Sequence, residues 1–546
     1  AQVSVTATAG TVGPTAYTTL KGAFDAINAG THQGAVTVAI TANTTESAPA
    51  VLNSSGAGAA IYTSVLVQPT VDGVTISGPT TTGRGLIELN GADNVTINGD
   101  NPNTGGINRN LTITNTAANT VTFTSVIRIA LATTIVTSAD NNTIKNLNLN
   151  GSATSRNIIG ASSSSGTENT TFGIVASSGA STVAATTAPS ALASVSATIG
   201  TGATATNLTI DNNNIQTVAR GIAVMATSTT VFPGTQITGN LIGNSTAAAV
   251  NQVYSVGITA QGSANGVISG NTVYLEGFVA TSSSSANRAI DVGGISAVGT
   301  YTIERNMVNR VTGNAPDFWL AHGINLGGGN GHIVRNNFVS NVTLNTTSGG
   351  FTSTTFCAAG IRIASGLNHQ IYHNTVNMNG VIPGATQTIT AALMITASTL
   401  TGIDVRNNIF VNSQTGAGLS PIFVAVWLPS GATSSMNLTL NNNDYFNGAV
   451  PTASQGIGQA GTTAGTNFYT QANFNSAVTT PATNFRSYTS TLSAGGLNAN
   501  ASTVASPPLT SSTDLHIVAA SVTPLESGGV AVGVSTDIDG QSRPSG

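Results

Sequence analysis

Charged residues are scarce in this chain, at 6% of 546 residues, and its 15 lysines and arginines are outnumbered by 19 aspartates and glutamates. An average soluble protein carries about 25% charged residues. With so few cations, no basic stripe could follow a phosphate backbone, so we expect no nucleic-acid partner. Attraction to an acidic membrane surface is equally unsupported.

Cysteine and long apolar runs are also lacking. A single residue, Cys357, allows no intrachain disulfide, and we expect no metal site built on thiolates and no cofactor. No run of about 18 apolar residues occurs, so we expect no membrane span. The chain opens Ala-Gln-Val-Ser, which resembles the start left by signal-peptide cleavage. These features indicate a secreted, extracellular or cell-surface protein.

Aromatic residues make up only 5% of the chain, against 40% for all apolar residues. This balance favours a narrow core filled by stacked isoleucine, valine, leucine and alanine. Chains rich in serine, threonine and glycine with few aromatics are often disordered. Regularly placed isoleucines and valines argue against disorder here.

A short pattern, Ile-x-x-Asn-x-(Val/Ile/Phe), recurs six times at steps of 27 to 38 residues. A period of this size indicates a solenoid, in which stacked units bury one another's apolar faces. Asparagine tolerates a left-handed backbone at turns, and stacked amides can hydrogen-bond from coil to coil. The predicted structural ladder, with the isoleucine three residues before each asparagine, comprises Asn213, Asn240, Asn271, Asn306, Asn336 and Asn374.

A second motif, Gly-Ile, precedes each asparagine unit and predicts another strand per coil. The distance from this isoleucine forward to the next asparagine varies little, whereas the return distance varies more, so we expect long loops on one edge. The motif occurs at Gly221-Ile222, Gly257-Ile258, Gly294-Ile295, Gly323-Ile324 and Gly360-Ile361.

The first 30 residues predict a cap. Residues 1–9 alternate as a half-buried strand does, with Val3, Val5 and Ala7 on one face. Residues 17–29 show apolar residues at helical spacing and are followed by Gly30. A solenoid must cover its terminal coil, so we expect this helix to cap it. The strand could pair with its own chain or be donated to a neighbouring copy, which makes its apolar face the assembly candidate.

The predicted organisation is therefore a strand at 1–16, a capping helix at 17–30, β-helix coils at 31–448, and irregular coils with an end cap at 449–546. The coils, the asparagine ladder and the front helix resemble right-handed parallel β-helices of the pectate-lyase-like superfamily. "YTTLKGAFDAINAG" (17–30) and "TDIDGQSRP" (536–544) resemble the opening and ending of large secreted surface proteins of the Bacteroidota. This resemblance implies an all-β right-handed parallel β-helix on or outside a Gram-negative cell, exported by an outer-membrane secretion machinery.

Cationic side chains precede several ladder positions. Alignment of the coils places Arg305, Arg335 and His373 together, with Arg406 there or one place off. Polysaccharide lyases of the resembling superfamily hold uronates with arginine and abstract a proton with arginine, lysine or histidine. In that interpretation Arg335 or His373 is a weak candidate base and Arg305 a carboxylate clamp. The alternative is a solvated stripe balanced by neighbouring acids.

Paired aspartates at equivalent positions and calcium-binding acidic repeats do not occur in the sequence, and no catalytic assignment is carried over. We therefore favour an extracellular structural or adhesive surface protein, such as a fibre subunit that assembles with its own copies. The alternatives are a lyase or glycoside hydrolase acting on acidic polysaccharide, or a carbohydrate-binding protein without turnover. Whether the chain is an enzyme stays open.

Overall fold

The chain forms two compact units, Ala1–Asn271 (unit 1) and Thr272–Gly546 (unit 2). The computed structural model describes residues 1–118, 121–132, 138–152, 172–178, 189–194, 197–200, 202–247, 249–277, 286–293, 299–314, 320–345, 354, 357–383, 388–416, 422–461, 467–474, 480–493, 502–519, 521–523, 525 and 528–543. Nearly all regular structure in both units is β-strand, which confirms the predicted fold class of a parallel β-helix.

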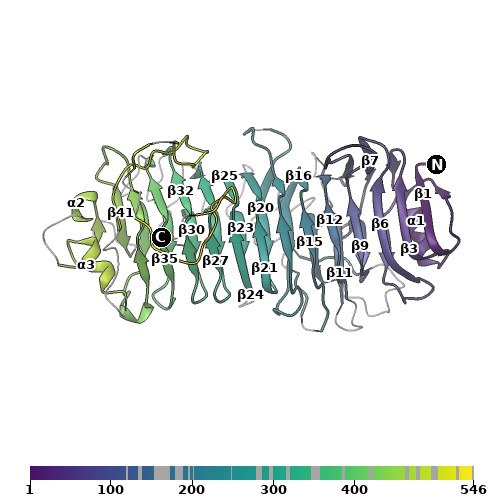
Figure 1. The fold of residues 1–546 in the computed structure, drawn as a ribbon, viewed down its shortest axis with the longest axis horizontal. Helices are drawn as coiled ribbons and strands as arrows, with labels where there is room; N and C mark the ends of the chain where they lie inside the picture. Colours follow the sequence, from purple (N-terminus) through teal and green to yellow (C-terminus); the bar gives the residue numbers. More distant parts are fainter. Residues whose placement is uncertain are drawn as a thin grey trace. The chain divides into compact units, whose positions relative to one another are not determined.

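Three columns of parallel strands build unit 1, because each coil contributes one strand to each column (Figure 1). The first column is β3 (His32–Ile40), β6 (Tyr62–Pro69), β9 (Val95–Asn98), β12 (Thr143–Lys145), β15 (Thr209–Asp211), β18 (Gln236–Thr238) and β21 (Ser263–Ser269). The second is β4 (Thr44–Thr45), β7 (Val74–Gly78), β10 (Leu111–Asn115), β13 (Leu147–Asn150), β16 (Asn214–Gln216) and β19 (Leu241–Ile242). The third is β5 (Ala50–Asn53), β8 (Gly85–Asn90), β11 (Ser125–Leu131), β14 (Phe172–Ser178), β17 (Val218–Val224) and β20 (Val253–Ala260).

Unit 2 repeats the three-column arrangement. Its first column is β24 (Gly299–Glu304), β27 (Ile333–Arg335), β31 (Gln370–Tyr372), β35 (Asp404–Arg406) and β39 (Thr439–Asn441). The second is β22 (Thr272–Glu276), β25 (Met307–Gly313), β28 (Phe338–Ser340) with β29 (Val342–Leu344), β32 (Thr375–Met378), β36 (Ile409–Asn412) and β40 (Asp444–Phe446). The third is β23 (Ala286–Val292), β26 (Leu320–Leu326), β30 (Ala358–Ile363), β34 (Ile389–Ile395), β38 (Ile422–Leu428) and β41 (Gln455–Ala460).

Smaller elements complete unit 2. The short pair β33 (Val381–Ile382) and β37 (Thr415–Gly416) runs parallel, and β42 (Phe468–Tyr469) pairs antiparallel with β41. The helices α2 (Gln471–Phe474) and α3 (Phe485–Ser490) and the 3₁₀ turn η1 (Ser434–Met436) follow or join the coils. Among the described residues, no helix is long and apolar enough to cross a membrane.

Isoleucines of successive coils stack in register and fill the core. In unit 1, Ile210 pairs with Ile237, which pairs with Ile268, and all three side chains are fully buried. Burial of each such side chain stabilises the fold by roughly 1.5–3 kcal/mol. The repeated isoleucine of the sequence is therefore the core position of the first column.

The Gly-Ile motif has a steric cause. A Cβ atom built on Gly221 would lie 2.5 Å from the backbone oxygen of Gly257 in the next coil. In unit 2, a Cβ on Gly323 would lie 2.5 Å from the oxygen of Gly360 and 2.4 Å from Val339 Cγ1. Backbones of successive coils thus approach too closely for a side chain, which is why glycine precedes the core isoleucine.

The N-terminal cap forms as a helix over the first coils. α1 (Leu20–Asn28) begins after Thr19, whose side chain accepts from the amide of Gly22, and its buried face includes Phe24. The buried carboxylate of Glu46 accepts from the amides of Leu20 and Lys21, each at 2.9 Å. A carboxylate is favourable there because helix N-termini carry unpaired donors and positive dipole charge.

The N-terminal strand lies within its own chain. β1 (Val3–Gly10) pairs antiparallel with β2 (Thr15–Tyr17) on one side and with β3 on the other. Val3 and Val5 are fully buried and Ala7 is 7% exposed. Donation of this strand to another copy would require it to leave both pairings and expose these three side chains.

Candidate functional site

Three adjacent rows of side chains run along the corner between the first and second strand columns of unit 2. The pairing of β24, β27, β31, β35 and β39 fixes the first row as Glu304, Arg335, Tyr372, Arg406 and Asn441. The next row is in the left-handed conformation and consists of Arg305, Asn336, His373, Asn407 and Asn442. The third row is the buried amide ladder Asn306, Asn337, Asn374, Asn408 and Asn443.

The ladder corrects the predicted register at one coil. Asn306 Nδ2 donates to Asn337 Oδ1 at 2.9 Å, and Asn337 Nδ2 donates to Asn374 Oδ1 at 2.9 Å. Asn336, predicted to belong to the ladder, instead occupies the left-handed position one residue earlier, with φ of 54°. The cause is the core residue of this coil, which is Val334 rather than Ile333.

The remaining predicted ladder residues do stack. In unit 1, Asn213 Nδ2 donates to Asn240 Oδ1 at 3.0 Å, and Asn240 Nδ2 donates to Asn271 Oδ1 at 2.9 Å. In unit 2, Asn374 Nδ2 donates to Asn408 Oδ1 at 3.0 Å. These amides also donate to backbone carbonyls of the preceding coil, as Asn240 does to Ile210 and Asn374 does to Val334, which makes the ladder part of the fold.

The predicted column of four cations divides between two rows. Arg335 and Arg406 share the first row with Tyr372 between them, while Arg305 and His373 share the second with Asn336 between them. This separation corrects the predicted alignment, which relied on the same one-residue error. Like charges consequently do not follow one another on successive coils.

Acidic side chains of the same corner neutralise the arginines. Arg335 Nε donates to Glu304 at 2.7 Å, and Arg406 Nε donates to Asp404 at 2.7 Å. The hydrogen bond to Asp404 and the negative charge of that carboxylate raise the pKa of Arg406, although burial alone would lower it. Burial, followed by the bond to Asp404, raises the pKa of Tyr372 to about 12. Both arginines of the first row are therefore in local ion pairs.

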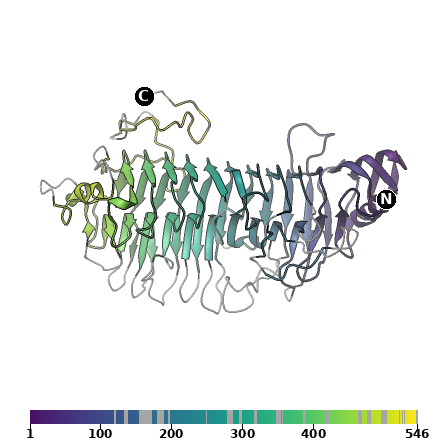
Figure 2. The same cartoon turned by 90° about the horizontal axis from the view of Figure 1, so that it is seen from below.

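The second row is covered by the described residues between 502 and 543, called here the C-terminal segment. In Figure 2 this yellow stretch crosses one side of the unit 2 coils. Asn336 Nδ2 donates to the Thr536 carbonyl at 2.8 Å, and Asn442 Nδ2 donates to the Gly528 carbonyl at 3.0 Å. Asn407 exchanges two hydrogen bonds with the backbone of Val530, at 2.7 and 3.0 Å. The outward amides thus hold a segment distant in sequence.

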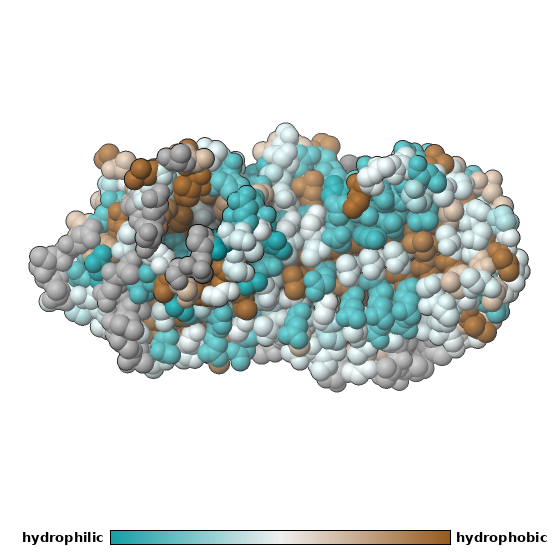
Figure 3. Space-filling model, viewed as in Figure 1, coloured by the Kyte–Doolittle hydropathy of each residue, from teal (hydrophilic) through white to brown (hydrophobic). Residues whose placement is uncertain are grey.

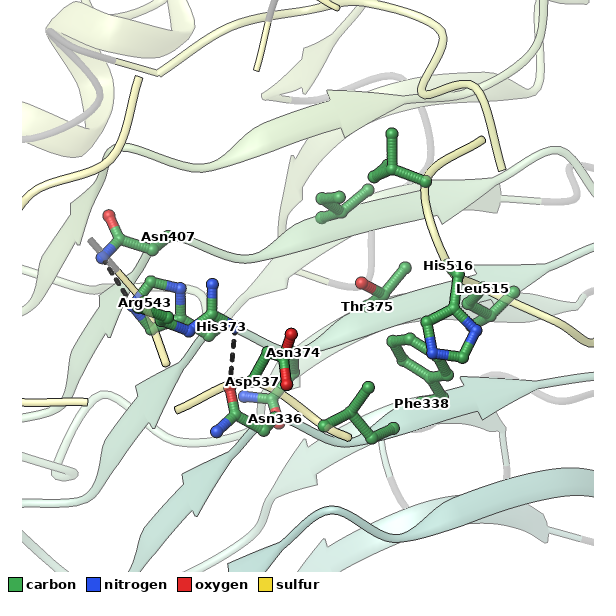
Figure 4. Close-up of a pocket in the computed structure, with 13 residues that line it drawn as sticks. Asn336, Phe338, His373, Asn374, Thr375, Asn407, Leu515, His516, Asp537 and Arg543 are labelled. Carbon is green, nitrogen blue, oxygen red and sulfur yellow. Dashed lines mark hydrogen bonds between the residues drawn. The ribbon is translucent and has the colours of Figure 1, made fainter. Parts of the chain in front are cut away.

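Figure 4 shows the space enclosed between the C-terminal segment and the coils. His373, Arg543 and Asn407 lie at one end, and Phe338, Leu515 and His516 lie at the other. The volume of this pocket is about 240 Å³, and a second pocket of about 260 Å³ shares His373, Asn407 and Arg543. The pockets are small and lined by both amide and apolar groups, and part of their lining is the chain's own C-terminal segment.

His373 is neutral at this position. Burial, and then the charge of Arg543, lowers the pKa of His373 to about 4. Its Nε2 accepts a hydrogen bond from Asn407 Nδ2 at 3.1 Å. Arg543 in turn donates to Asn336 Oδ1 at 3.0 Å, so the histidine and the arginine are both held by row asparagines.

A histidine bridges two turns of the C-terminal segment. His516 Nδ1 lies 2.5 Å from Asp514 Oδ1, and Nε2 lies 3.1 Å from Asp539 Oδ2. Burial alone would lower the pKa of His516, but the two carboxylates outweigh it and raise that pKa. The ring also packs edge-on against Phe338, with centroids 4.8 Å apart. This bridge joins the two turns to each other and to the coils.

No protein-family model matches this chain, and no curated protein matches it. One solved structure that aligns with it is the crystal structure of PfbA, a surface adhesin of Streptococcus pneumoniae. The alignment covers 73% of this chain and 87% of the other, with 12% sequence identity and a TM-score of 0.34.

Asn407, Asn442, Arg543 and His516 belong to this region, and the sequence did not indicate them as functional residues. One signal was present. Consecutive asparagines occur at 336–337, 407–408 and 441–443, and in each group one amide enters the ladder while its predecessor points outward. No comparable sequence pattern marks Arg543 or His516.

Replacement of His516 by alanine is expected to loosen the C-terminal segment, because the bridge between Asp514 and Asp539 disappears. The effect should be larger below the raised pKa of His516, where the wild-type imidazole is charged, than above it. Limited proteolysis followed by mass spectrometry measures this as faster cleavage between 502 and 543. Equal cleavage rates in both proteins at acidic and alkaline pH would contradict the bridge.

Proposed function

We propose that this chain is an extracellular structural or adhesive surface protein that presents a stiff β-helical scaffold and does not act as a polysaccharide-degrading enzyme. Support comes chiefly from one observation about the cations that the sequence nominated for binding acidic polysaccharide. Arg305, Arg335 and Arg406 are paired with Glu304 or Asp404, and His373 lines a pocket closed by the chain's own C-terminal segment. A uronate-binding groove needs such cations free to meet substrate.

The surface is consistent with presentation rather than chemistry. On the face drawn in Figure 3, hydrophilic and near-neutral side chains predominate and hydrophobic ones occur in small groups. Hydroxyls and amides supply most of this polarity, because only 6% of the residues are charged. The proposal includes a location on or outside a Gram-negative cell, membership of the secreted surface proteins of the Bacteroidota and export by their outer-membrane machinery, in line with the two terminal segments.

Depolymerisation assays test the proposal. The purified chain is incubated with polygalacturonate and with alginate, and new reducing ends and unsaturated products are followed, with a known lyase as positive control. We expect no new chain ends from wild-type protein or from Arg335→Ala and His373→Ala variants. Turnover that is abolished in either variant, with unchanged thermal unfolding, would establish the alternative enzymatic function.

Negative-stain electron microscopy at neutral pH tests the structural part. Ordered filaments or regular end-to-end assemblies would support a fibre subunit. If only single particles appear, retention of the protein on immobilised polysaccharide is measured next. If the protein neither assembles nor is retained on polysaccharide, both the structural and the adhesive form of the proposal are contradicted.

A further inference from the structure

The dipeptide Asn-Gly recurs along this chain and is chemically reactive. The backbone nitrogen that follows an asparagine can attack the carbon of the side-chain amide, and a glycine at that place has no Cβ to hinder the attack. In unit 2, Asn379-Gly380 forms the turn between β32 and β33. We infer that Asn379 is a site of spontaneous covalent modification, at which the folded protein converts an asparagine into aspartate and isoaspartate.

The turn fixes its carbonyl groups but leaves the attacking nitrogen free. Gln414 Nε2 donates to the Asn379 carbonyl at 3.4 Å, and the Thr415 amide donates to the Gly380 carbonyl at 3.0 Å. Among the described residues, neither the N–H of Gly380 nor the side chain of Asn379 has a hydrogen-bond partner. Gly380 is exposed and Asn379 is half-buried. The nucleophile and the amide that it attacks are therefore adjacent, and both are unpaired.

The reaction needs only water. Gly380 N loses its proton and forms a bond to Asn379 Cγ, and Nδ2 of the side chain leaves as ammonia with that proton. Water then opens the cyclic imide at one of its two carbonyl carbons. Opening at Cγ gives aspartate, whereas opening at the backbone carbonyl gives isoaspartate, in which the main chain runs through Cβ and Cγ. No oxidation state changes.

Other Asn-Gly pairs of the chain lack the free nitrogen. In four of them the glycine N–H donates to a carbonyl of the next coil at 2.9–3.1 Å. Such an N–H must be released by local opening before it can lose its proton, which slows the attack. The four bonds join Gly91 to Ala130, Gly99 to Lys145, Gly151 to Gln216 and Gly331 to Leu367.

Two further pairs are restrained in other ways. Asn265 lies within the strand β21, where an extended backbone holds the following nitrogen away from the side-chain carbon. Asn447 is fully buried, and its Oδ1 accepts from Gln471 Nε2 at 2.5 Å. Asn379-Gly380 thus combines an unpaired glycine nitrogen with an unpaired asparagine side chain.

The modification changes both charge and backbone at this turn. Either product adds a negative charge, and isoaspartate also lengthens the main chain by one carbon. Val381 pairs with Thr415 at the start of β33 and β37, directly after the turn, so a longer main chain displaces this short pair. This inference goes beyond the proposed function and does not depend on it.

Peptide mass spectrometry of the folded chain, incubated over several weeks at mildly alkaline pH, tests the inference. Asn330 is the internal control, because it stands in the same dipeptide and is exposed, but its Gly331 N–H is bonded to Leu367 at 2.9 Å. We expect Asn379 to convert at least tenfold faster than Asn330 in the folded chain. In guanidinium, which removes the bond of Gly331, the two asparagines should convert at similar rates.

Asn379→Gln is the matched variant, since its longer side chain must close a larger and less favourable ring. Conversion at position 379 should fall at least tenfold and that at Asn330 should stay the same, while the melting temperature shows that the variant folds. Conversion of Asn379 no faster than that of Asn330 in the folded chain would overturn the inference. A product that is aspartate alone, without isoaspartate, would overturn the attack by Gly380.

Discussion

Replacing Asn337 by alanine is expected to lower the free energy of unfolding by about 3–5 kcal/mol, since each buried group left without a partner costs about 1–3 kcal/mol. Asn337 is fully buried, and its Oδ1 accepts from both the backbone and side-chain nitrogens of Asn306, at 3.0 and 2.9 Å. Its Nδ2 donates to Asn374 Oδ1 and to the Ile303 carbonyl, at 2.9 and 2.8 Å. Alanine supplies none of these bonds.

Asn336→Gly is the matched control, one residue away. Asn336 has a left-handed backbone with φ of 54°, which glycine adopts without strain. It loses only its bonds to Thr536 and Arg543 of the C-terminal segment, so the expected loss is about 1 kcal/mol. Guanidinium unfolding followed by circular dichroism compares the two variants. A larger loss at Asn336 than at Asn337 would restore the register predicted from the sequence and refute the one described.

The architecture follows from the sequence because its two determinants are periodic. A core aliphatic residue, most often isoleucine, and a ladder asparagine recur along the coils, so their order can be read without knowing any contact. The predicted register was wrong in the one coil where two alignments fit the pattern equally well. Ile333 precedes Asn336 by three residues, and Val334 precedes Asn337 by three. Valine and isoleucine are interchangeable in such a core, so the pattern could not decide between them.

The second motif shows the same limit. Ile295 was expected in a strand after Gly294, but both lie outside the described residues. The core position of that coil is Ile290, which pairs with Ile324 and follows Ala289. Alanine stands here where the neighbouring coil carries Gly323, so the motif was hidden. β14 (Phe172–Ser178) carries the motif as Gly173-Ile174, which was not among the occurrences identified from the sequence.

The candidate site was harder to predict because its partners are far apart in the chain. Asn336 and Arg543 are 207 residues apart, and Asn407 and Val530 are 123 apart. The C-terminal segment carries no repeat that aligns it with a coil. Its contacts with the coils depend on individual asparagine side chains and on the path of the chain after the last coil. Neither can be predicted from composition or periodicity.

Acid is expected to destabilise this protein through two stacked histidines of unit 2. His332 and His369 are fully buried, with ring centroids 4.9 Å apart and planes at 7°. Nδ1 of His332 accepts from the Tyr301 amide at 3.0 Å, and Nδ1 of His369 accepts from the His332 amide at 3.2 Å. The other ring nitrogens donate to backbone carbonyls of Gly328 and Ser365. Both rings must therefore be neutral.

The sign of the effect follows from the pKa values. Burial, and then the neighbouring His369, lowers the pKa of His332 to about 3 from 6.5, and burial lowers that of His369 as well. As the pH falls below 6.5, these histidines bind protons in the unfolded chain but not in the folded one. The free energy of unfolding is therefore highest above pH 6.5 and declines below it. His332 alone should lower the free energy of unfolding by roughly 3 kcal/mol at a pH two units below its unfolded pKa.

Guanidinium unfolding at about pH 7.5 and about pH 4.5 measures this loss in the wild type and in a His332→Asn/His369→Asn variant. Asparagine keeps an acceptor near the Nδ1 position and does not titrate, so the variant should be less stable at neutral pH but lose less on acidification. His322 and His373, whose pKa values burial also lowers, account for part of the remaining slope.

His516→Asn provides a control of opposite sign. The carboxylates of Asp514 and Asp539 raise the pKa of His516, so its contribution to stability is present at low pH and lost as the pH rises. Its removal should steepen the acid loss, whereas removal of the stacked pair should flatten it. An unchanged slope in the double variant would mean that the buried rings accept protons without breaking their backbone bonds, which the geometry of both Nδ1 atoms forbids.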